Sequence, residues 1–376
     1  MHTNKIRVWS LPTRLFHWLL VTSFALCWWW QDDQHLYFHL LAGYLFFGLL
    51  LFRLVWGFVG EPHARFRDFV HGTGEVMNYL KSLCSGRPQH HLGHNPAGGW
   101  AIVALIGCGL LVGLTGIVTL GAEERHGPLA GVLGFQEGMF FHILHEGFSW
   151  IMLALVIMHL LGVLIESRLH HENLTLAMVT GKKVADRPER PAPAHAIVGL
   201  GLVTAVAGFS GWWLKDYFNQ TPDEPHRPFR GTELAKDPLW QEECGGCHLA
   251  YHPSLLPARS WERIFSTQAD HFGEDLALDE TTIARLLAFA VAHAAESQPT
   301  EAAWKILISI PAQQTPRRIT ATPYWLRKHE EIADWVWRMP KVNGAFNCDA
   351  CHLDAHEGWF EDDAMGIPTP DEGERP

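Results

Sequence analysis

The chain has 376 residues, enough for two or three domains. Hydrophobic residues make up 48% of it, and its formal net charge is −11. Residues 1–214 hold 14 Lys and Arg against 13 Asp and Glu, whereas residues 215–376 hold 15 against 27. Because the second half is so acidic, the composition argues against a nucleic-acid partner.

Five apolar segments cover residues 15–31, 39–59, 98–120, 141–165 and 196–214. Each is close to the roughly 20 residues that a helix needs to cross a bilayer. The first follows basic residues as a secretory signal would, but Trp28, Trp29 and Trp30 stand where a cleavage site needs small residues. We therefore predict an uncleaved anchor and a multi-pass protein of the bacterial inner membrane.

The basic residues predict the orientation, because cytoplasmic loops carry an excess of Lys and Arg. The opposite loops hold only Arg125. Twelve basic residues fall on the side of the N-terminus: Lys5, Arg7, Arg14, Arg65, Arg67, Lys81, Arg87, Arg168, Lys182, Lys183, Arg187 and Arg190. This places the N-terminus in the cytoplasm and the acidic C-terminal half in the periplasm.

Four histidines lie within or at the ends of the apolar segments: His17, His39, His145 and His159. Ionisable side chains at membrane depth are rare and mark functional sites. His145 and His159 share nearly one helix face and lie about 21 Å apart along it. Depth pairs His17 with His159 near the cytoplasm (the inner pair) and His39 with His145 near the periplasm (the outer pair). Imidazole ligates haem iron, so we predict two bis-histidine b haems.

Other interpretations of these histidines remain open. Single histidines near helix ends often only reach the lipid headgroups. His35 and His142 compete with His39 and His145 as ligands, and His142 lies one helical turn from His145. A zinc site is also possible in principle, although pairs spread over several helices suit a large planar ligand better.

A family resemblance appears in several stretches. They are residues 7–18 (RVWSLPTRLFHW), 39–44 (HLLAGY), 52–60 (FRLVWGFVG), 92–98 (LGHNPAG) and 159–174. Together they resemble the bacterial cytochrome b561 family, which includes b-type subunits of hydrogenases, over about residues 4–183. The resemblance implies a four-helix di-haem b cytochrome that exchanges electrons with quinone, and it supports the four ligands. The fifth segment lies outside this core and is predicted to connect it to the periplasm.

Three arginines are candidates to neutralise haem propionates: Arg14, Arg53 and Arg168. Their alternative role is to reach the membrane surface with the charged tip while the stem stays in lipid. His94 and Asn95 are candidates for a quinone or proton-exchange site, with a loop or a helix cap as the alternative.

The acidic half contains Cys-x-x-Cys-His twice, at Cys244, Cys247 and His248 and again at Cys348, Cys351 and His352. This pattern is the attachment signature of c-type haem. The thiols bind the haem covalently, and the histidine becomes the proximal ligand. A zinc ribbon would not need both histidines, and two-residue loops make poor structural disulfides. Three isolated cysteines, Cys27, Cys84 and Cys108, are predicted to be structural.

The second half resembles a small periplasmic di-haem cytochrome c family over about residues 232–366. The matching blocks are residues 247–251 (CHLAY), 255–261 (LLPARSW), 271–275 (HFGED) and 319–324 (ITATPY). Within its motif blocks the resemblance indicates His271 and His329 as distal ligands. Chain proximity assigns His271 to His248 and His329 to His352, with the exchanged pairing open. His252 is predicted to lie on the surface.

The predicted fold is all-α. Residues 1–183 form a cytochrome b561-like membrane domain, and 184–230 form a connector with the fifth transmembrane helix and a linker at 216–228. Residues 231–366 form the di-haem c domain, with helices at 281–295 and 330–338, and 367–376 form a disordered tail.

Two b haems and two c haems on one chain predict a transmembrane electron carrier. It would connect the quinone pool with a soluble periplasmic cytochrome or haem protein, because the cofactors carry the chemistry. A superoxide-oxidising or ferric-reducing enzyme is a second hypothesis. A haem-based sensor is a third, and it would require an open iron position.

Overall fold

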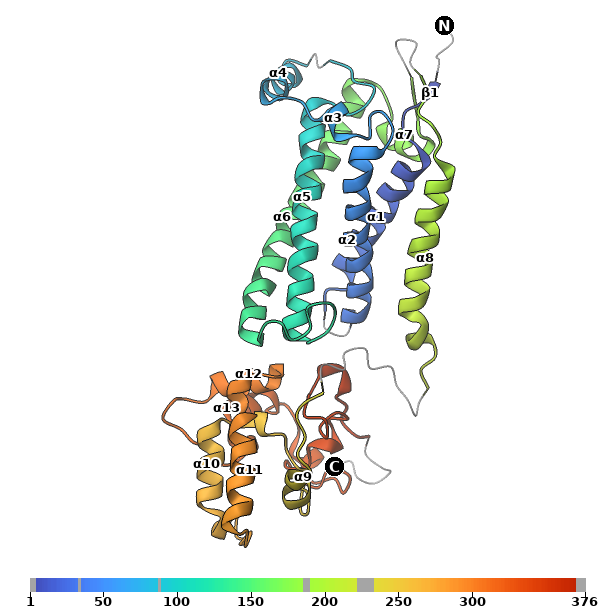
Figure 1. The fold of residues 1–376 in the computed structure, drawn as a ribbon. Coiled ribbons are helices and arrows are strands. Elements are labelled where there is room, and N and C mark those ends of the chain that lie inside the picture. The colour runs from blue at the N-terminus through green and yellow to red at the C-terminus, as the bar shows by residue number, and fades with distance from the viewer. Residues whose placement is uncertain (1–4, 33–34, 87–88, 185–189, 222–232, 370–376) are drawn as a thin grey trace. The chain divides into compact units, whose positions relative to one another are not determined.

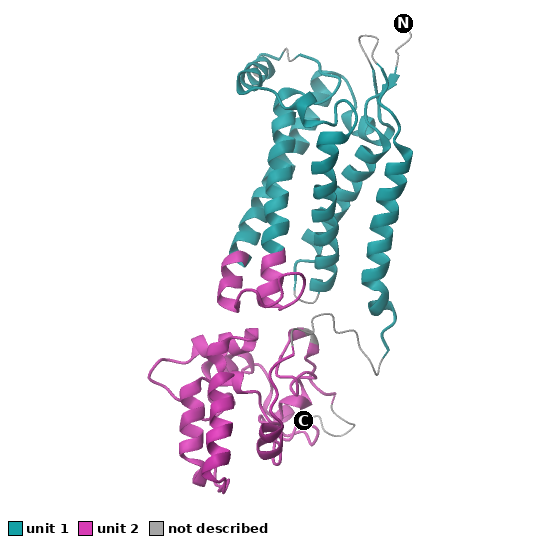
Figure 2. Ribbon diagram, in the orientation of Figure 1, with its two compact units in different colours: residues 1–116, 142–226 teal, residues 117–141, 227–376 magenta. Residues whose placement is uncertain are grey.

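The computed structural model describes residues 5–32, 35–86, 89–184, 190–221 and 233–369. Arg87 and Arg187, much of the predicted linker and most of the predicted tail lie outside these ranges. The described chain is mostly helical and divides into two compact units (Figure 2). Unit 1 comprises residues 1–116 and 142–226, and unit 2 comprises 117–141 and 227–376.

Unit 1 is built from five long helices (Figure 1). They are α1 (Leu11–Trp29), α2 (Leu36–Val59), α5 (Pro96–Glu123), α6 (Phe135–Leu169) and α8 (Ala196–Phe218). The ends of α5 and α6 between residues 117 and 141 are counted with unit 2. Short elements gather where α1 begins: α3 (Phe66–Phe69), α4 (Thr73–Cys84), α7 (Leu174–Thr180), β1 (Lys5–Arg7) and β2 (Lys182–Val184). β1 and β2 pair antiparallel, with Ile6 opposite Lys183.

Four of the described helices are long and apolar enough to cross a membrane: α2, α5, α6 and α8. The chain is therefore a multi-pass membrane protein. Of the five predicted spans, the first is not shown as one. Its helix α1 has 19 residues, and Pro12, Arg14 and His17 in its first turns lower its mean hydropathy.

The interior of unit 1 lies between α2, α5 and α6. Phe46, Leu50, Ile106 and Met152 are buried there. Glycines on α5 allow the close approach of α2, since a Cβ on Gly113 would stand 2.2 Å from a ring carbon of Phe47. Small residues commonly serve this purpose between membrane helices. Large apolar side chains on α6 and α8 point outward, as expected for surfaces that face lipid.

Unit 2 contains short helices and turns. Its helices are α9 (Pro238–Cys244), α10 (Ala258–Ser266), α11 (Glu280–Ala292), α12 (Glu301–Ser309), α13 (Pro323–Lys328) and α14 (Asp334–Trp337). The main core packs Trp240, Trp261 and Leu286. The helix predicted at 281–295 corresponds to α11. The one predicted at 330–338 was wrong, because α13 ends before His329 and Ala333 precedes the short helix α14.

Candidate metal centres

The outer pair comes together from two long helices. His39 lies near the start of α2 and His145 near the start of α6, with ring centres 6.2 Å apart. The Nδ1 of His39 is 3.0 Å from the Cys27 carbonyl oxygen, and that of His145 is 2.9 Å from the Val112 carbonyl oxygen. Each carbonyl accepts the Nδ1 proton, which fixes the ring and leaves Nε2 as an acceptor for a metal.

The spacing of these rings has a simple interpretation. A metal bound by two imidazoles lies about 2 Å from each nitrogen, and each nitrogen lies about 1 Å from its ring centre, so the ring centres should be about 6 Å apart. His39 and His145 satisfy this condition, with their ring planes at 78°.

The inner pair consists of His17 on α1 and His159 on α6, which are close enough to interact electrostatically. The Nδ1 of His17 is buried and has no hydrogen-bond partner in the described part of the chain. The structure thus brings together the two pairs that helix depth predicted. Their role as iron ligands remains a prediction.

The competing histidines occupy other positions. His35 precedes α2, is exposed, and places its Nδ1 2.7 Å from Asp32. His142 is exposed on α6, one turn from His145.

Unit 2 contains two further pairs. The rings of His248 and His271 are 6.4 Å apart, and those of His329 and His352 are 6.2 Å apart. His248 and His329 also place Nδ1 on backbone carbonyls, at 2.7 and 2.8 Å. These are the pairs that chain proximity assigned, and three of the four predicted ligand pairs therefore have ring centres 6.2–6.4 Å apart.

The local backbone structure determines the positions of both candidate distal histidines. His271 opens a turn that closes on Glu274, in which Phe272 and Gly273 have φ values of 59° and 103°. His329 ends α13 and stacks on Trp325, with ring centres 4.3 Å apart. Burial lowers the pKa values of His271 and His329. Both rings are therefore neutral at pH 7, as metal ligands must be.

The cysteines of the two motifs lie beside these histidines. Cys244 ends α9, and Cys348 begins a one-turn 3₁₀ helix. None of these four cysteines forms a disulfide, and burial raises the pKa values of Cys244 and Cys348 to about 12. Neutral buried thiols are poor nucleophiles for disulfide exchange, which disfavours a redox dithiol at either motif.

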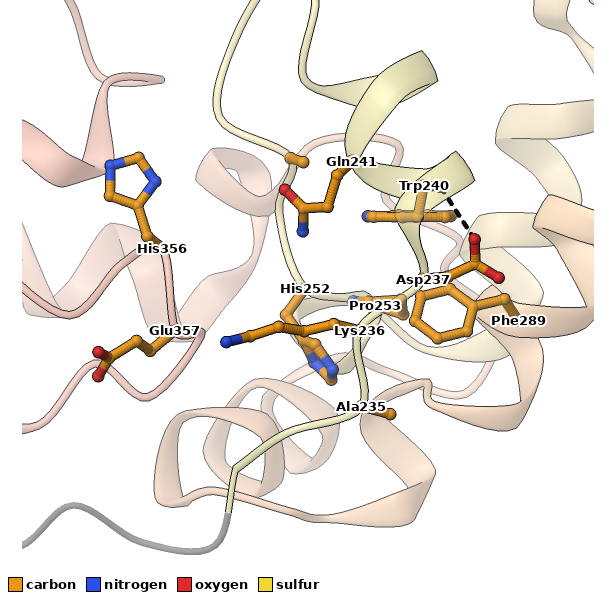
Figure 3. A pocket seen from close by; sticks show the side chains of 11 residues that line it. Ala235, Lys236, Asp237, Trp240, Gln241, His252, Pro253, Phe289, His356 and Glu357 are labelled. Carbon is orange, nitrogen blue, oxygen red and sulfur yellow. Dashed lines mark hydrogen bonds between the residues drawn. The ribbon is translucent and has the colours of Figure 1, made fainter.

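His252 departs from its prediction. It is half-buried rather than on the surface, and its Nδ1 accepts from the backbone N–H of Ser254, which caps a 3₁₀ helix. Its ring lines a small pocket with Lys236, Gln241 and Glu357 (Figure 3). Burial lowers its pKa to about 4.

The candidate arginines differ from one another. Arg14 donates to the backbone carbonyls of Val179 and Ser10 and so joins the last turn of α7 to the start of α1. Arg53 is only 5% exposed and lies over the rings of Phe66 and Phe69. Its Nη1 has no partner among the described residues, so Arg53 is the better candidate for an anionic group. Arg168 is exposed.

A haem group fits this donor set. Near the inner pair, buried polar atoms of His17, Arg53, Glu61 and His94 have no hydrogen-bond partner within the described ranges, and such atoms are costly unless a ligand satisfies them. A Cβ on Gly43 or Gly162 would meet no atom within 4 Å. Gly43 lies about one turn from His39, so there is space on that side of α2, whereas Gly162 lies on the exposed surface of α6.

His94 and Asn95 have well-defined partners. His94 packs between Trp9 and Phe69, with ring centres 4.7 and 4.8 Å away, and its burial lowers its pKa to about 3. Asn95 caps α5 by accepting from Gly98, and its amide donates to Glu166 at 2.9 Å. The polar contacts of Glu166, which extend to His170, were not predicted from the sequence. The spacing of four residues between Glu166 and His170 was a signal that could have pointed to them.

Two family models match the chain. Residues 8–181 match "Prokaryotic cytochrome b561", and residues 240–360 match "Dihaem cytochrome c". The chain therefore carries an N-terminal cytochrome b561 domain of the Ni-hydrogenase B type fused to a C-terminal dihaem cytochrome c domain. Both domains imply haem-based electron transfer, with b-type haems in the first and c-type haems in the second.

Two relatives are similar to the cytochrome b561 part of the chain. Probable Ni/Fe-hydrogenase B-type cytochrome subunits from Azotobacter vinelandii and Cupriavidus necator are 28% and 26% identical over 169 and 159 residues. These matches cover 40% and 38% of this chain and 70% and 64% of the relatives, so the chain spans about two thirds of their length.

Solved structures match the dihaem cytochrome c domain. The diheme cytochrome c from Rhodobacter sphaeroides is 37% identical, with 34% of this chain and 100% of that chain covered and a TM-score of 0.31. The diheme cytochrome c from Shewanella baltica is 33% identical, with 36% and 95% covered and a TM-score of 0.29.

Proposed function

We propose that this fusion carries electrons across the inner membrane between the quinone pool and a soluble periplasmic cytochrome or haem protein. The observation that carries the proposal is the set of four histidine pairs. Three have ring centres 6.2–6.4 Å apart, and the fourth joins His17 of α1 to His159 of α6, the helix that also carries His145. Bis-histidine ligation leaves no open iron position, which suits electron transfer rather than sensing.

The proposed cofactors are two b haems and two c haems, each of which supplies an iron that gains and loses one electron. His17 and His159 would hold the inner b haem, and His39 and His145 the outer one. Arg53 would neutralise a propionate. His248 with His271 and His352 with His329 would ligate the c haems, which the four motif cysteines would bind covalently.

The chain's own residues fix the geometry of these sites. Backbone carbonyls orient the rings of His39, His145, His248 and His329. Rings that are fixed before the iron changes charge have little to rearrange, which favours rapid transfer.

The predicted orientation and domain limits remain part of the proposal. The N-terminus would be cytoplasmic, α1 would be a membrane span, and residues 231–366 would form the periplasmic domain. The relatives are named as hydrogenase subunits. In this chain the fused dihaem cytochrome c would take the place of an external redox partner.

The decisive experiment adds a quinol analogue to the full-length protein and follows the b and c absorption bands separately. We expect four irons per chain and reduction of the b haems followed by the c haems. The proposal is wrong if the b haems are reduced and the c haems never follow.

A further inference from the structure

A row of polar side chains gathers around the end of α6. Figure 1 shows this end of α6 at the same end of unit 1 as the start of α1. The Nδ2 of Asn95 donates to Glu166 at 2.9 Å, and the other carboxylate oxygen of Glu166 is 3.2 Å from the Nε2 of His170. The His170 ring centre is 5.2 Å from that of His90. The Nε2 of His90 is in turn 3.5 Å from Glu172.

These residues come from separate segments. His90 and Asn95 precede α5, Glu166 is in the last turns of α6, and His170 and Glu172 follow that helix. The row thus depends on tertiary packing rather than on one helix surface.

Burial increases along the row towards the membrane helices. The side chain of His90 is 30% exposed, whereas those of His170 and Glu166 are 15% and 14% exposed. Lys183 on β2 is 4% exposed and pairs with Glu172 at 3.1 Å. Exposed ion pairs are common and contribute little, but carboxylates and imidazoles withdrawn from water are costly to keep. A row of such groups that leads inwards from the partly exposed His90 is therefore more consistent with a functional role than with stabilisation alone.

The chemistry of the row suits the movement of protons. It runs from the carboxylate of Glu166 through the imidazoles of His170 and His90 to Glu172, and each group can accept a proton and release it to its neighbour. The Nε2 of His170 lies close to Glu166 but is not aligned as a hydrogen bond, so the ring is not locked in one donor role. Burial, followed by the charges of His90 and Lys183, lowers the pKa of His170. Its ring is neutral at pH 7 and can accept a proton.

We propose that Glu166, His170 and His90 form a proton path between the aqueous surface and a quinone-reacting site beside the inner pair. This inference rests on the proposed function. Glu166 stands seven residues, or about two turns, beyond His159 on α6. When a quinol is oxidised there, it loses two electrons and two protons and leaves as quinone. The electrons reduce two ferric irons to ferrous irons, and the protons leave through Glu166, His170 and His90.

The test uses the full-length, haem-loaded protein and decylubiquinol as reductant. We expect Glu166→Gln and His170→Asn each to slow reduction of the b haems by about 100-fold, at the low end of the contribution of general acid–base groups. Dithionite, which delivers electrons without protons, should reduce the b haems of both variants as completely as those of the wild type. His90→Asn, at the exposed end, supplies a third variant.

The pH profile separates a proton path from a structural role. His170 is faced by Glu166 on its own helix, by His90 and His91 from the segment before α5, by Glu172, and by Lys183 from β2. The wild-type rate should fall in acid, below about pH 6.5, as His170 takes up a proton. In His170→Asn this acid limb should disappear.

A matched control comes from α4. His71 and Glu75 form another pair at a spacing of four residues, with Nδ1 2.8 Å from the carboxylate. Glu75→Gln should leave quinol-driven reduction unchanged. Wild-type rates in Glu166→Gln and His170→Asn, or equal slowing in Glu75→Gln, would overturn the proton path alone. A wild-type protein that no quinol reduces would overturn the proposed function itself.

Discussion

The two units bring imidazole rings to nearly the same separation by different means. In the membrane unit, His39 and His145 stand on two long helices and are oriented by carbonyls of Cys27 and Val112, on two further helices. In the dihaem unit, His271 stands in a turn of four residues and His329 at the end of α13. A bundle of helices can hold a cofactor by ligands alone. A small domain of turns needs the covalent bonds that its cysteines would provide.

This comparison predicts opposite results for the removal of one ligand from each unit. His39→Ala should abolish binding of the outer b haem. The loss of affinity should exceed the roughly 10–100-fold loss that is typical when a group supporting a ligand, rather than the ligand itself, is removed. His329→Ala should keep its haem, because the thioether bonds remain, but should leave an open iron position that binds carbon monoxide. Haem content and carbon monoxide difference spectra measure both effects.

The controls for this experiment also test the pairing. His35→Ala, which alters an exposed histidine near His39, should leave haem content unchanged. If His329→Ala instead opens the haem attached at Cys244 and Cys247, the exchanged pairing is correct. If His39→Ala keeps all its b haem, the outer pair has been misassigned.

The same difference explains what the sequence could predict. The pairing in the membrane unit followed from helix depth alone, since helices that cross a membrane can be placed along one axis. The distal ligands His271 and His329 lie in short, irregular segments, and only motif resemblance pointed to them. The burial of His252 was missed because its position depends on contacts with Lys236 and Gly358, far away in the chain. The row that starts at Glu166 was missed for the same reason.

Two of the three candidate arginines, Arg53 and Arg14, give the next effect. Arg53→Gln should weaken binding of the inner b haem by about 10–100-fold, the range expected when a supporting group is lost. Arg14→Gln should not change haem binding, because its donors already bind backbone carbonyls. Haem titration of the apoprotein measures both. An equal loss in the two variants would show that Arg53 acts only through folding.

Acid should destabilise the dihaem unit through His252. Its pKa is about 4 in the folded chain, against an ordinary value of 6.5. Between these values the unfolded chain binds a proton that the folded chain does not, so stability is lost as pH falls below 6.5. The loss should be on the order of 1–2 kcal/mol at pH 5.

His252→Asn isolates this effect, because asparagine can still cap the 3₁₀ helix but does not titrate. Thermal melting of the full-length protein, followed at the c-haem band, should show a smaller drop between pH 7 and pH 5 in this variant. His356→Asn changes an exposed histidine that lines the same pocket and should melt as the wild type does at both pH values. An unchanged pH dependence in His252→Asn would contradict the assignment.

The smallest expected effect tests how rigidly the helix bundle holds the imidazole ring of His145, at a site where no covalent bond would attach the haem. A Cβ on Gly116 would lie 3.0 Å from Cε1 of His145, so the ring would have to move by a few tenths of an ångström. Gly116→Ala should keep both b haems but shift the redox midpoint and the electron paramagnetic resonance signal of the outer one. Gly107→Ala, on the same helix with open space around it, should change neither and should stabilise α5 slightly, since alanine favours helix. Redox titration compares the two. If Gly116→Ala also leaves the outer haem unchanged, the ring of His145 has more freedom than its bond to Val112 implies, and the helix bundle holds its ligands less rigidly than the turns of the dihaem unit do.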